Sequence, residues 1–354
     1  MSPVAVALVA PREVRLVEEP AAALGPRQVR VRTLYSGISA GTELAAYRGT
    51  SPFLRKRWDP TRRLFEQDDG DASLTYPLTT WGYEEVGEVV ERGAELGDGG
   101  DLPPGTRVYG TWGHRSQAVI DAATASQRVL PPDMEPLLGI YSHIGPIALN
   151  GVLDTAVRLG ETVAVFGLGV VGQLVAQLLH RAGARVIGVD GIAQRRDTAL
   201  GLGLDMALDP AEPVAERIRE ITAGRGADVC VEASGSTRAL HEATRACAYG
   251  SRVVVLGFYQ GDAAGLFLGE EFHHNRISLV CSQIGGVAVE LQQRWDRLRL
   301  VFTFMDLAAR GDVRCTPLIT HRVPADDAPS IYELLDARPH DVLQAVLDFR
   351  DSAT

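Results

Sequence analysis

The second half of the chain alternates short apolar runs with amphipathic stretches. The apolar runs have the length and β-branched composition of buried strands, and they cover residues 161–167, 184–190, 227–235, 251–259 and 276–285. Between them, apolar residues recur at helical spacing over 170–182, 193–202, 211–223 and 237–248, and a further helix is expected near 290–310. Strands separated by helices predict a parallel, doubly wound sheet of the α/β class. We therefore expect residues 153–313 to fold as one domain.

The first half has a different pattern, in which short β-branched runs are separated by glycine and proline. These runs cover residues 4–9, 28–37, 85–93, 106–112 and 117–121, and their spacing predicts a barrel-like, all-β domain. Residues 314–354 show the pattern of a strand, a helix and a strand. We expect this segment to rejoin the first domain, which otherwise spans residues 1–152.

Residues 51–77 interrupt the strand pattern of the first domain with a stretch that is basic at first and then acidic. We expect a long surface loop here. Three roles remain open for it: a lid for an anionic or polyhydroxylated substrate, a solvated charged loop, or a contact within an oligomer.

Composition narrows the class of protein. A length of 354 residues suits two domains, and 45% hydrophobic with 23% charged residues is typical of a globular protein. A net charge of -10 argues against a nucleic-acid partner, because phosphate binding depends on a basic surface. No run approaches the roughly 20 apolar residues of a membrane span, and the N-terminus lacks the basic region of a secretory signal. We expect a cytoplasmic protein that binds a small molecule.

The clearest local motif is a G-x-G-x-x-G that directly follows a predicted strand and opens a predicted helix. It comprises Gly167, Leu168, Gly169, Val170, Val171 and Gly172. In the nucleotide-binding fingerprint the first glycine permits a tight turn, the second lets the backbone approach a pyrophosphate, and the third allows close packing of helix and strand. The positive end of the helix then faces the phosphates. This context predicts a Rossmann-type dinucleotide site.

The second strand of this domain ends at Asp190, 18 residues after Gly172. An acidic side chain near this offset binds the ribose hydroxyls of NAD and repels the 2'-phosphate of NADP, so we predict NAD. Arg195 and Arg196 follow within a turn, and an arginine there favours the opposite preference. Further candidate cofactor-binding residues follow the carboxyl ends of later strands: Ser234, Gly257, Phe258 and Ser282.

With these motifs in order, the chain resembles the medium-chain dehydrogenase/reductase superfamily over nearly its whole length. The landmarks are Ser36-Gly37-Ile38-Ser39, Gly41-Thr42-Glu43, Gly82-Tyr83-Glu84, Gly105-x-Arg107-Val108, the glycine motif from Gly167 to Gly172, and Ile319-Thr320-His321-Arg322. The resemblance implies a GroES-like β-barrel domain followed by a Rossmann domain, with the active site in the cleft between them. It also implies a homodimer or homotetramer, in which an edge strand such as residues 276–285 pairs between subunits.

Many members of that family hold a catalytic zinc, and the resemblance places Ser39, Tyr83 and Ser142 at the ligand positions. Zinc prefers thiolate, imidazole or carboxylate ligands, so these residues predict a protein without a metal site. No cysteine precedes Cys230, so the structural zinc loop of the family is missing as well. Glu84 and His143 align near the cleft, but two candidate ligands do not complete a site.

Without zinc, hydride transfer needs a protein group to exchange the proton. We rank His143 first, because an imidazole titrates near working pH, and Tyr83 second, because a phenol needs help from a cation. His114 is a third candidate, and Ser39 and Glu84 complete the candidate catalytic set. His321, His273 and His274 are interpreted as structural or surface residues.

Three functions remain open. The first is a zinc-independent NAD(H)-dependent oxidoreductase acting between C–OH and C=O of a sugar, polyol or secondary alcohol; the Ser36–Glu43 segment looks like that of zinc-less relatives such as bacteriochlorophyllide dehydrogenases. The second is an NADPH-dependent quinone or enoyl reductase acting on C=C, against which Asp190 counts. The third is a nucleotide-binding protein without turnover.

Overall fold

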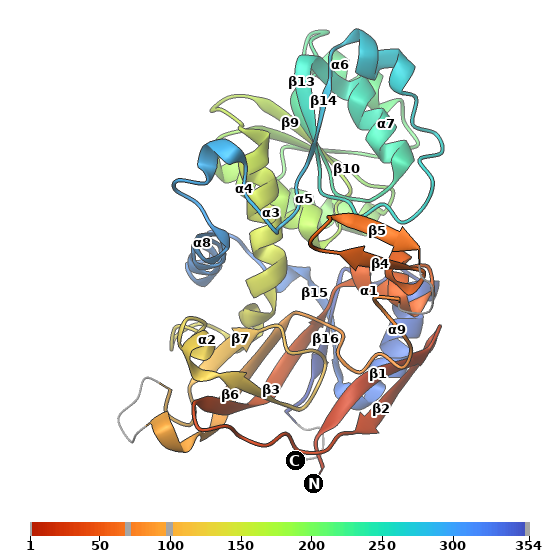
Figure 1. The fold of residues 1–354 in the computed structure, drawn as a ribbon. Helices are drawn as coiled ribbons and strands as arrows, with labels where there is room; N and C mark the ends of the chain where they lie inside the picture. The colour runs from red at the N-terminus through yellow and green to blue at the C-terminus, as the bar shows by residue number, and fades with distance from the viewer. Residues whose placement is uncertain (1, 68–71, 97–101, 351–354) are drawn as a thin grey trace. The chain divides into compact units, whose positions relative to one another are not determined.

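The computed structural model describes residues 2–67, 72–96 and 102–350, which form two compact units (Figure 1). Unit 1 comprises residues 1–143 and 319–354, and unit 2 comprises residues 144–318. The domain boundary expected at residue 153 falls inside helix α3 (Tyr141–Thr155), and the one expected at 313 falls between α8 (Arg297–Ala309) and β15 (Ile319–Pro324). None of the described helices is both long and apolar enough to cross a membrane.

Unit 2 contains a six-stranded parallel sheet with the strand order β11-β10-β9-β12-β13-β14. Its strands are β9 (Thr162–Phe166), β10 (Arg185–Val189), β11 (Met206–Leu208), β12 (Ala227–Glu232), β13 (Cys247–Val255) and β14 (Ser278–Cys281). Between them lie α4 (Val170–Arg181), α5 (Ala193–Gly201), α6 (Val214–Ile221) and α7 (Thr237–Ala246). This is the predicted doubly wound Rossmann topology, in which the strand order reverses between β9 and β12.

Apolar side chains of α6 and α7 pack on one face of this sheet. Ile218 of α6 and Ala243 of α7 are fully buried in one core cluster with Ala164, Cys230 and Val253 from three neighbouring strands. Burial on both faces explains why these strands are almost continuously apolar in the sequence.

Unit 1 is built on a mixed sheet with the order β15-β16-β3-β6-β7, in which β8 also pairs with β3. The further strands are β1 (Val4–Ala10), β2 (Glu13–Glu18), β3 (Gln28–Ile38), β6 (Glu85–Arg92), β7 (Arg107–Gly110), β8 (Gln117–Asp121) and β16 (Gln344–Asp348). Three helices accompany them: α1 (Ala40–Tyr47), α2 (Ala122–Ser126) and α9 (Ala328–Ala337). Strand β16 pairs antiparallel with β3, so the C-terminal segment belongs to unit 1. The predicted fold class, a GroES-like domain plus a Rossmann domain, is confirmed.

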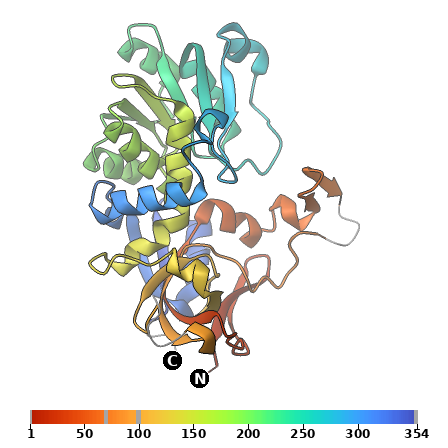
Figure 2. The same ribbon diagram turned by 60° about the vertical axis from the view of Figure 1, so that its left-hand side comes forward.

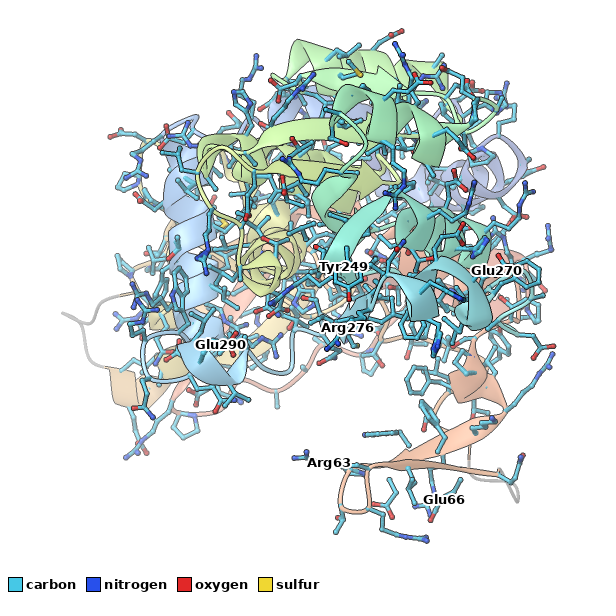
Figure 3. All side chains as sticks on the ribbon, turned by 90° about the horizontal axis from the view of Figure 1, so that it is seen from above. Arg63, Glu66, Tyr249, Glu270, Arg276 and Glu290 are labelled. Carbon is cyan, nitrogen blue, oxygen red and sulfur yellow. The ribbon has the colours of Figure 1, made fainter. Side chains whose placement is uncertain are left out.

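The segment expected to be a loop over residues 51–77 contains a β-hairpin. Strands β4 (Lys56–Asp59) and β5 (Leu64–Gln67) pair antiparallel, with Trp58 directly opposite Phe65. The two rings lie 5.0 Å apart, and Arg57 forms a 2.6 Å ion pair with Glu66 across the strands. The hairpin projects from the rest of unit 1 (Figures 2 and 3). The charge pattern of this segment does not predict a hairpin. The two strands are instead stabilised by one cross-strand aromatic pair and one cross-strand ion pair.

Candidate functional site

The glycine motif of unit 2 forms the tight turn between β9 and α4. Gly167 has a φ of +92°, and a Cβ there would lie 2.8 Å from the backbone nitrogen of Ser234. A Cβ on Gly172 would lie only 1.8 Å from the carbonyl oxygen of Gly167. Gly169, the N-cap of α4, is different, because a Cβ there would meet no described atom closer than Arg195 Nη1 at 4.0 Å. Two glycines therefore shape the turn, while the third leaves open space at the helix N-terminus.

A pocket of about 960 Å³ opens beside this turn within unit 2. Its lining includes the predicted residues Gly167, Asp190, Arg195 and Ser234. Leu168 is fully buried beneath the turn, whereas Val171 is half-buried. The volume and the glycine turn fit the adenosine half of a dinucleotide, because pockets of this size bury most of such a ligand.

Asp190 is held rigidly at the end of β10. Its Oδ2 accepts the N–H of Leu168 at 2.7 Å, and its Oδ1 accepts the N–H of Ile192 at 2.8 Å. Arg195 Nη1 lies 3.9 Å from Asp190 Oδ2, and burial lowers the pKa of Arg195 against the opposing attraction of Asp190. Each carboxylate oxygen keeps acceptor capacity beyond its one backbone donor. The carboxylate is thus positioned to accept hydrogen bonds from ribose hydroxyls.

A residue that the sequence analysis did not single out, Glu232, organises the loop after β12. Its Oε1 accepts the N–H of Ser234 at 2.8 Å, and its Oε2 accepts the N–H of Gly235 at 3.1 Å and the hydroxyl of Tyr259. Gly257 packs against this loop, since a Cβ there would lie 2.4 Å from the nitrogen of Gly235. The available signal was an acidic residue at the carboxyl end of strand β12, directly after the apolar run Val229–Val231.

Two further predicted cofactor residues lie elsewhere in unit 2. Phe258 is 44% exposed, beyond the carboxyl end of β13. Ser282 is buried and accepts a 3.4 Å hydrogen bond from the side-chain amide of Asn150 on α3. Neither lines the pocket beside Asp190.

Among the described residues, one group of three side chains is close enough to share a metal ion: His241, Glu270 and Glu271. Arg245 already pairs with Glu271 at 3.5 Å, and His241 lies 3.8 Å from Glu270. Because both carboxylates already have basic side chains beside them, we interpret the cluster as a group of surface polar contacts.

On unit 1, three of the predicted catalytic residues come together. The Tyr83 hydroxyl donates a 2.5 Å hydrogen bond to Ser39 Oγ, and the Tyr83 ring lies 4.8 Å from the His143 imidazole. Ser39 is the N-cap of α1, but its hydroxyl makes no capping bond. It is directed instead to Tyr83. Hydroxyl, phenol and imidazole therefore form one contiguous polar group.

Glu84, the fourth predicted catalytic residue, is fully buried beside this group. Neither of its carboxyl oxygens has a hydrogen-bond partner among the residues that the structure describes. Burial raises the pKa of Glu84 well above its usual range, reinforced by Glu43 and Glu85 and opposed by nearby Ser39 and Gln344. Burial, with Glu84 and Glu43, also raises the pKa of Tyr83. Tyr83 is therefore a neutral phenol near pH 7, and the surroundings of Glu84 favour its neutral form over its ionised form.

The donor set at the positions that bind zinc in many relatives does not fit that metal. Ser39 and Ser142 offer only hydroxyls, and Tyr83 is a neutral phenol whose proton is engaged by Ser39. Zinc sites in proteins use thiolate, imidazole or ionised carboxylate ligands. Glu84 is the one carboxyl group among these residues, and its raised pKa favours the neutral form, which is a poor ligand.

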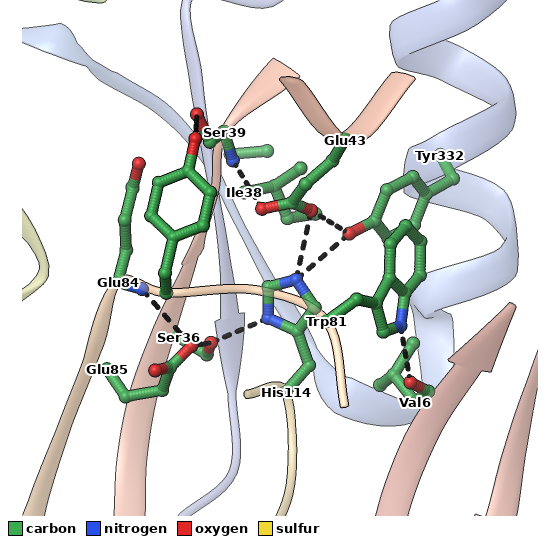
Figure 4. Close-up of polar contacts among 12 residues, drawn as sticks. Val6, Ser36, Ile38, Ser39, Glu43, Trp81, Glu84, Glu85, His114 and Tyr332 are labelled. Carbon is green, nitrogen blue, oxygen red and sulfur yellow. Dashed lines mark hydrogen bonds and ion pairs between the residues drawn. The ribbon is translucent and has the colours of Figure 1, made fainter. Parts of the chain in front are cut away.

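His114, ranked third as a proton carrier, is fully buried in unit 1. It lies between Glu43 and Ser36 (Figure 4), with Nε2 3.0 Å from Glu43 Oε2 and Nδ1 2.6 Å from Ser36 Oγ. This arrangement is not predictable from sequence spacing, because Glu43 and Ser36 lie 71 and 78 residues from His114 in the chain.

Comparison with known proteins adds three findings. A family model described as "Zinc-binding dehydrogenase" matches residues 170–300. The D-guloside 3-dehydrogenase of Escherichia coli (strain K12) is 32% identical over 347 residues, covering 96% of this chain and 98% of the relative. Two solved structures share the fold over 98% of this chain. One, from Sinorhizobium meliloti 1021, is described as "a putative zinc-binding dehydrogenase" bound to NADP (TM-score 0.77, 21% identity, 99% of that chain). The other, from E. coli CFT073, is described as a "short chain alcohol dehydrogenase" complexed with NADH (TM-score 0.75, 18% identity, 100% of that chain).

Proposed function

Because the chain belongs to the medium-chain dehydrogenase/reductase superfamily, and is thereby an oxidoreductase of the alcohol and polyol type, we propose that it is a zinc-independent, NAD(H)-dependent dehydrogenase of a secondary hydroxyl on a sugar or glycoside. The observation that carries this proposal is the polar group of Ser39, Tyr83 and His143. Ser39 and Tyr83 stand at two positions that the resemblance assigns to zinc ligands, and His143 adds an imidazole beside them. The relative that acts on a D-guloside supports a polyhydroxylated substrate.

The cofactor fits the residues present in unit 2. Gly167 and Gly172 shape the turn, Gly169 leaves room for a pyrophosphate at the N-terminus of α4, and Asp190 presents acceptors for ribose hydroxyls. When bound, the nicotinamide accepts the hydride from the carbinol carbon. Ser39 and Tyr83 are placed to hydrogen-bond the substrate oxygen. His143 then takes the hydroxyl proton as a general base, directly or through Tyr83.

Changing Asp190 to serine tests the choice of NAD. We expect the affinity for NADH to fall about 10- to 100-fold, because a lost hydrogen bond to a charged group costs about 1.5–3 kcal/mol. The affinity for NADPH should fall less or rise, because the repulsion of the 2'-phosphate is removed. Fluorescence titration of both nucleotides measures this, with Asp209→Ser on the same pocket as the control. An unchanged preference between the two nucleotides contradicts the proposed cofactor.

Metal analysis tests the proposed independence from zinc. We expect purified protein to contain less than about 0.1 zinc per chain and to keep its activity after dialysis against a chelator, because the Ser39, Tyr83 and Ser142 oxygens are weak zinc ligands. Plasma emission spectrometry and a rate assay measure the two quantities. Activity that disappears when metal is removed and returns when zinc is added would contradict the proposed independence from zinc.

The substrate class is tested by a panel of alkyl glycosides, free sugars, polyols and simple secondary alcohols assayed with NAD. Enones are assayed in the reducing direction with NADH and with NADPH. The proposal predicts that glycosides or sugars are oxidised with the highest kcat/KM. Turnover restricted to enones with NADPH supports a reductase of C=C bonds, and tight NADH binding without turnover of any class supports a nucleotide-binding protein.

A further inference from the structure

Five polar side chains form a buried network inside unit 1 that the proposed proton transfer does not use (Figure 4). Their exposed fractions are 4% for Glu43 and 0% for the other four, which are Ser36, Glu85, His114 and Tyr332. They come from β3, α1, β6, the loop before β8, and α9. Burying this many polar groups is costly unless each finds a partner. The donors and acceptors within this network therefore indicate which nitrogens of the His114 ring carry a proton.

The proton on Nδ1 of His114 follows from the bonds of Ser36. With Glu85 ionised beside the His114 ring, the Ser36 hydroxyl donates its one proton to Glu85 Oε1, 2.9 Å away. Only lone pairs of Ser36 Oγ then remain for His114 Nδ1, which lies 2.6 Å away. A nitrogen at this distance from a lone pair must itself donate. Nδ1 therefore carries a proton.

The proton on Nε2 follows from the bonds of Glu43 and Tyr332. Tyr332 donates its hydroxyl proton to Glu43 Oε2, so its oxygen presents only lone pairs to His114 Nε2 at 3.1 Å. Glu43 Oε2 is itself an acceptor, 3.0 Å from the same nitrogen. Nε2 faces two acceptors and must donate. With both nitrogens protonated, the ring is an imidazolium.

The surrounding carboxyl groups supply the balancing charge. Glu43 Oε1 accepts the N–H of Ser39 at 2.9 Å, so both of its oxygens act as acceptors. Glu85 accepts the backbone N–H groups of Glu84 and Trp112 at 3.1 and 2.7 Å. Burial alone lowers the pKa of His114, but Glu43 and Glu85 together outweigh burial and raise that pKa. Glu84, Glu85 and Tyr332 all have pKa values raised by burial.

The chain makes room for this ring at a specific position. Gly82 has a φ of +91°, and a Cβ there would lie 2.6 Å from the His114 imidazole. Trp81, the preceding residue, stacks on Tyr332 at 4.7 Å and lies edge-on to His114 at 5.6 Å. The segment that carries Tyr83 therefore also encloses the buried histidine.

Glu43 links the network to the polar group at which we place the chemistry. One of its oxygens contacts the His114 ring, and the other accepts the backbone N–H of Ser39. The Ser39 hydroxyl in turn accepts the hydrogen bond that Tyr83 donates. We propose that His114 is a permanently protonated imidazolium that holds Glu43 in place, and that Glu43 is a positioning residue for the Ser39–Tyr83 hydrogen bond. The first part stands on the network itself, and the effect on turnover rests on the proposed function.

Selective ¹⁵N-histidine labelling and NMR test the imidazolium directly in the wild-type protein. At pH 9 we expect one of the eight histidines to keep both ring nitrogens protonated. In Glu43→Gln, which removes the ionised partner, that signal should become neutral at pH 9. In Tyr332→Phe, which keeps the ion pair, it should persist. Absence of any imidazolium signal above pH 8, or persistence in Glu43→Gln, overturns the assignment.

Steady-state kinetics test the positioning role. We expect Glu43→Gln to lower kcat by about 10- to 100-fold, because small misplacements of reacting groups have effects of this size. NADH affinity should be unchanged, since unit 2 supplies that site, and Tyr332→Phe should retain most of the activity. Unchanged kcat in Glu43→Gln overturns the positioning role. A wild-type protein that oxidises no substrate refutes the proposed function, while the NMR experiment still decides the state of His114.

Discussion

Replacing His143 with alanine is expected to lower the turnover number by about 100- to 10,000-fold, the usual range for loss of a general acid or base. The imidazole lies 4.8 Å from the Tyr83 ring. Tyr83 itself stays protonated and cannot accept the proton as a base, because burial and neighbouring carboxyl groups raise its pKa. The affinity for NADH should stay within about twofold of the wild type, because the glycine turn and Asp190 belong to unit 2. Steady-state kinetics and fluorescence titration measure the two quantities.

Two other variants show whether the effect is specific to His143. His321→Ala removes an imidazole of the same unit whose Nδ1 bonds only to the neighbouring Thr320 among the described contacts, and it should leave turnover unchanged. Tyr83→Phe removes the donor to Ser39 and should lower turnover less than His143→Ala. If His143→Ala keeps wild-type turnover while Tyr83→Phe loses it, the proton passes to Tyr83 or to an ordered water, and His143 has another role.

The parallel sheet was predictable from the sequence because its determinants are local. The glycine motif, the first two apolar strands and Asp190 lie within about 30 consecutive residues, where periodicity and turn chemistry act directly. Asp190 lines the pocket beside this motif. The hydrogen bonds that it accepts from Leu168 and Ile192 were not predictable, since they depend on the exact path of two loops.

The network around His114 was not predictable from the sequence, because its members lie far apart in the chain. Tyr332 meets Glu43 across 289 positions, and no spacing rule relates them. The family-like motifs drew attention to Ser39 and Tyr83, while Glu43 and Gly82 were noted only as landmarks. In the structure these two landmarks have clear physical roles, because Glu43 binds the imidazole and Gly82 leaves space for it.

Replacing Gly172 with alanine is expected to abolish nucleotide binding and to destabilise unit 2. The new Cβ would lie 1.8 Å from the carbonyl oxygen of Gly167, and because that atom belongs to the backbone, the turn itself must move. Overpacking of this kind costs about 1–3 kcal/mol or more. For a unit of this size that lowers Tm by several degrees, at about 2–4 °C per kcal/mol. Differential scanning calorimetry and NADH titration measure both effects.

Gly169→Ala is the matched variant, because it adds the same methyl group three residues earlier in open space. No described atom lies closer than 4.0 Å to the new Cβ, so we expect the Tm to be unchanged. NADH affinity should nevertheless fall about 10-fold or more, since the methyl group occupies the path by which a pyrophosphate approaches the helix N-terminus. Gly201→Ala in α5, where a Cβ also meets nothing, should change neither quantity. If Gly169→Ala binds NADH as tightly as the wild type, the phosphates do not lie on this turn, and the cofactor site must be sought elsewhere in unit 2.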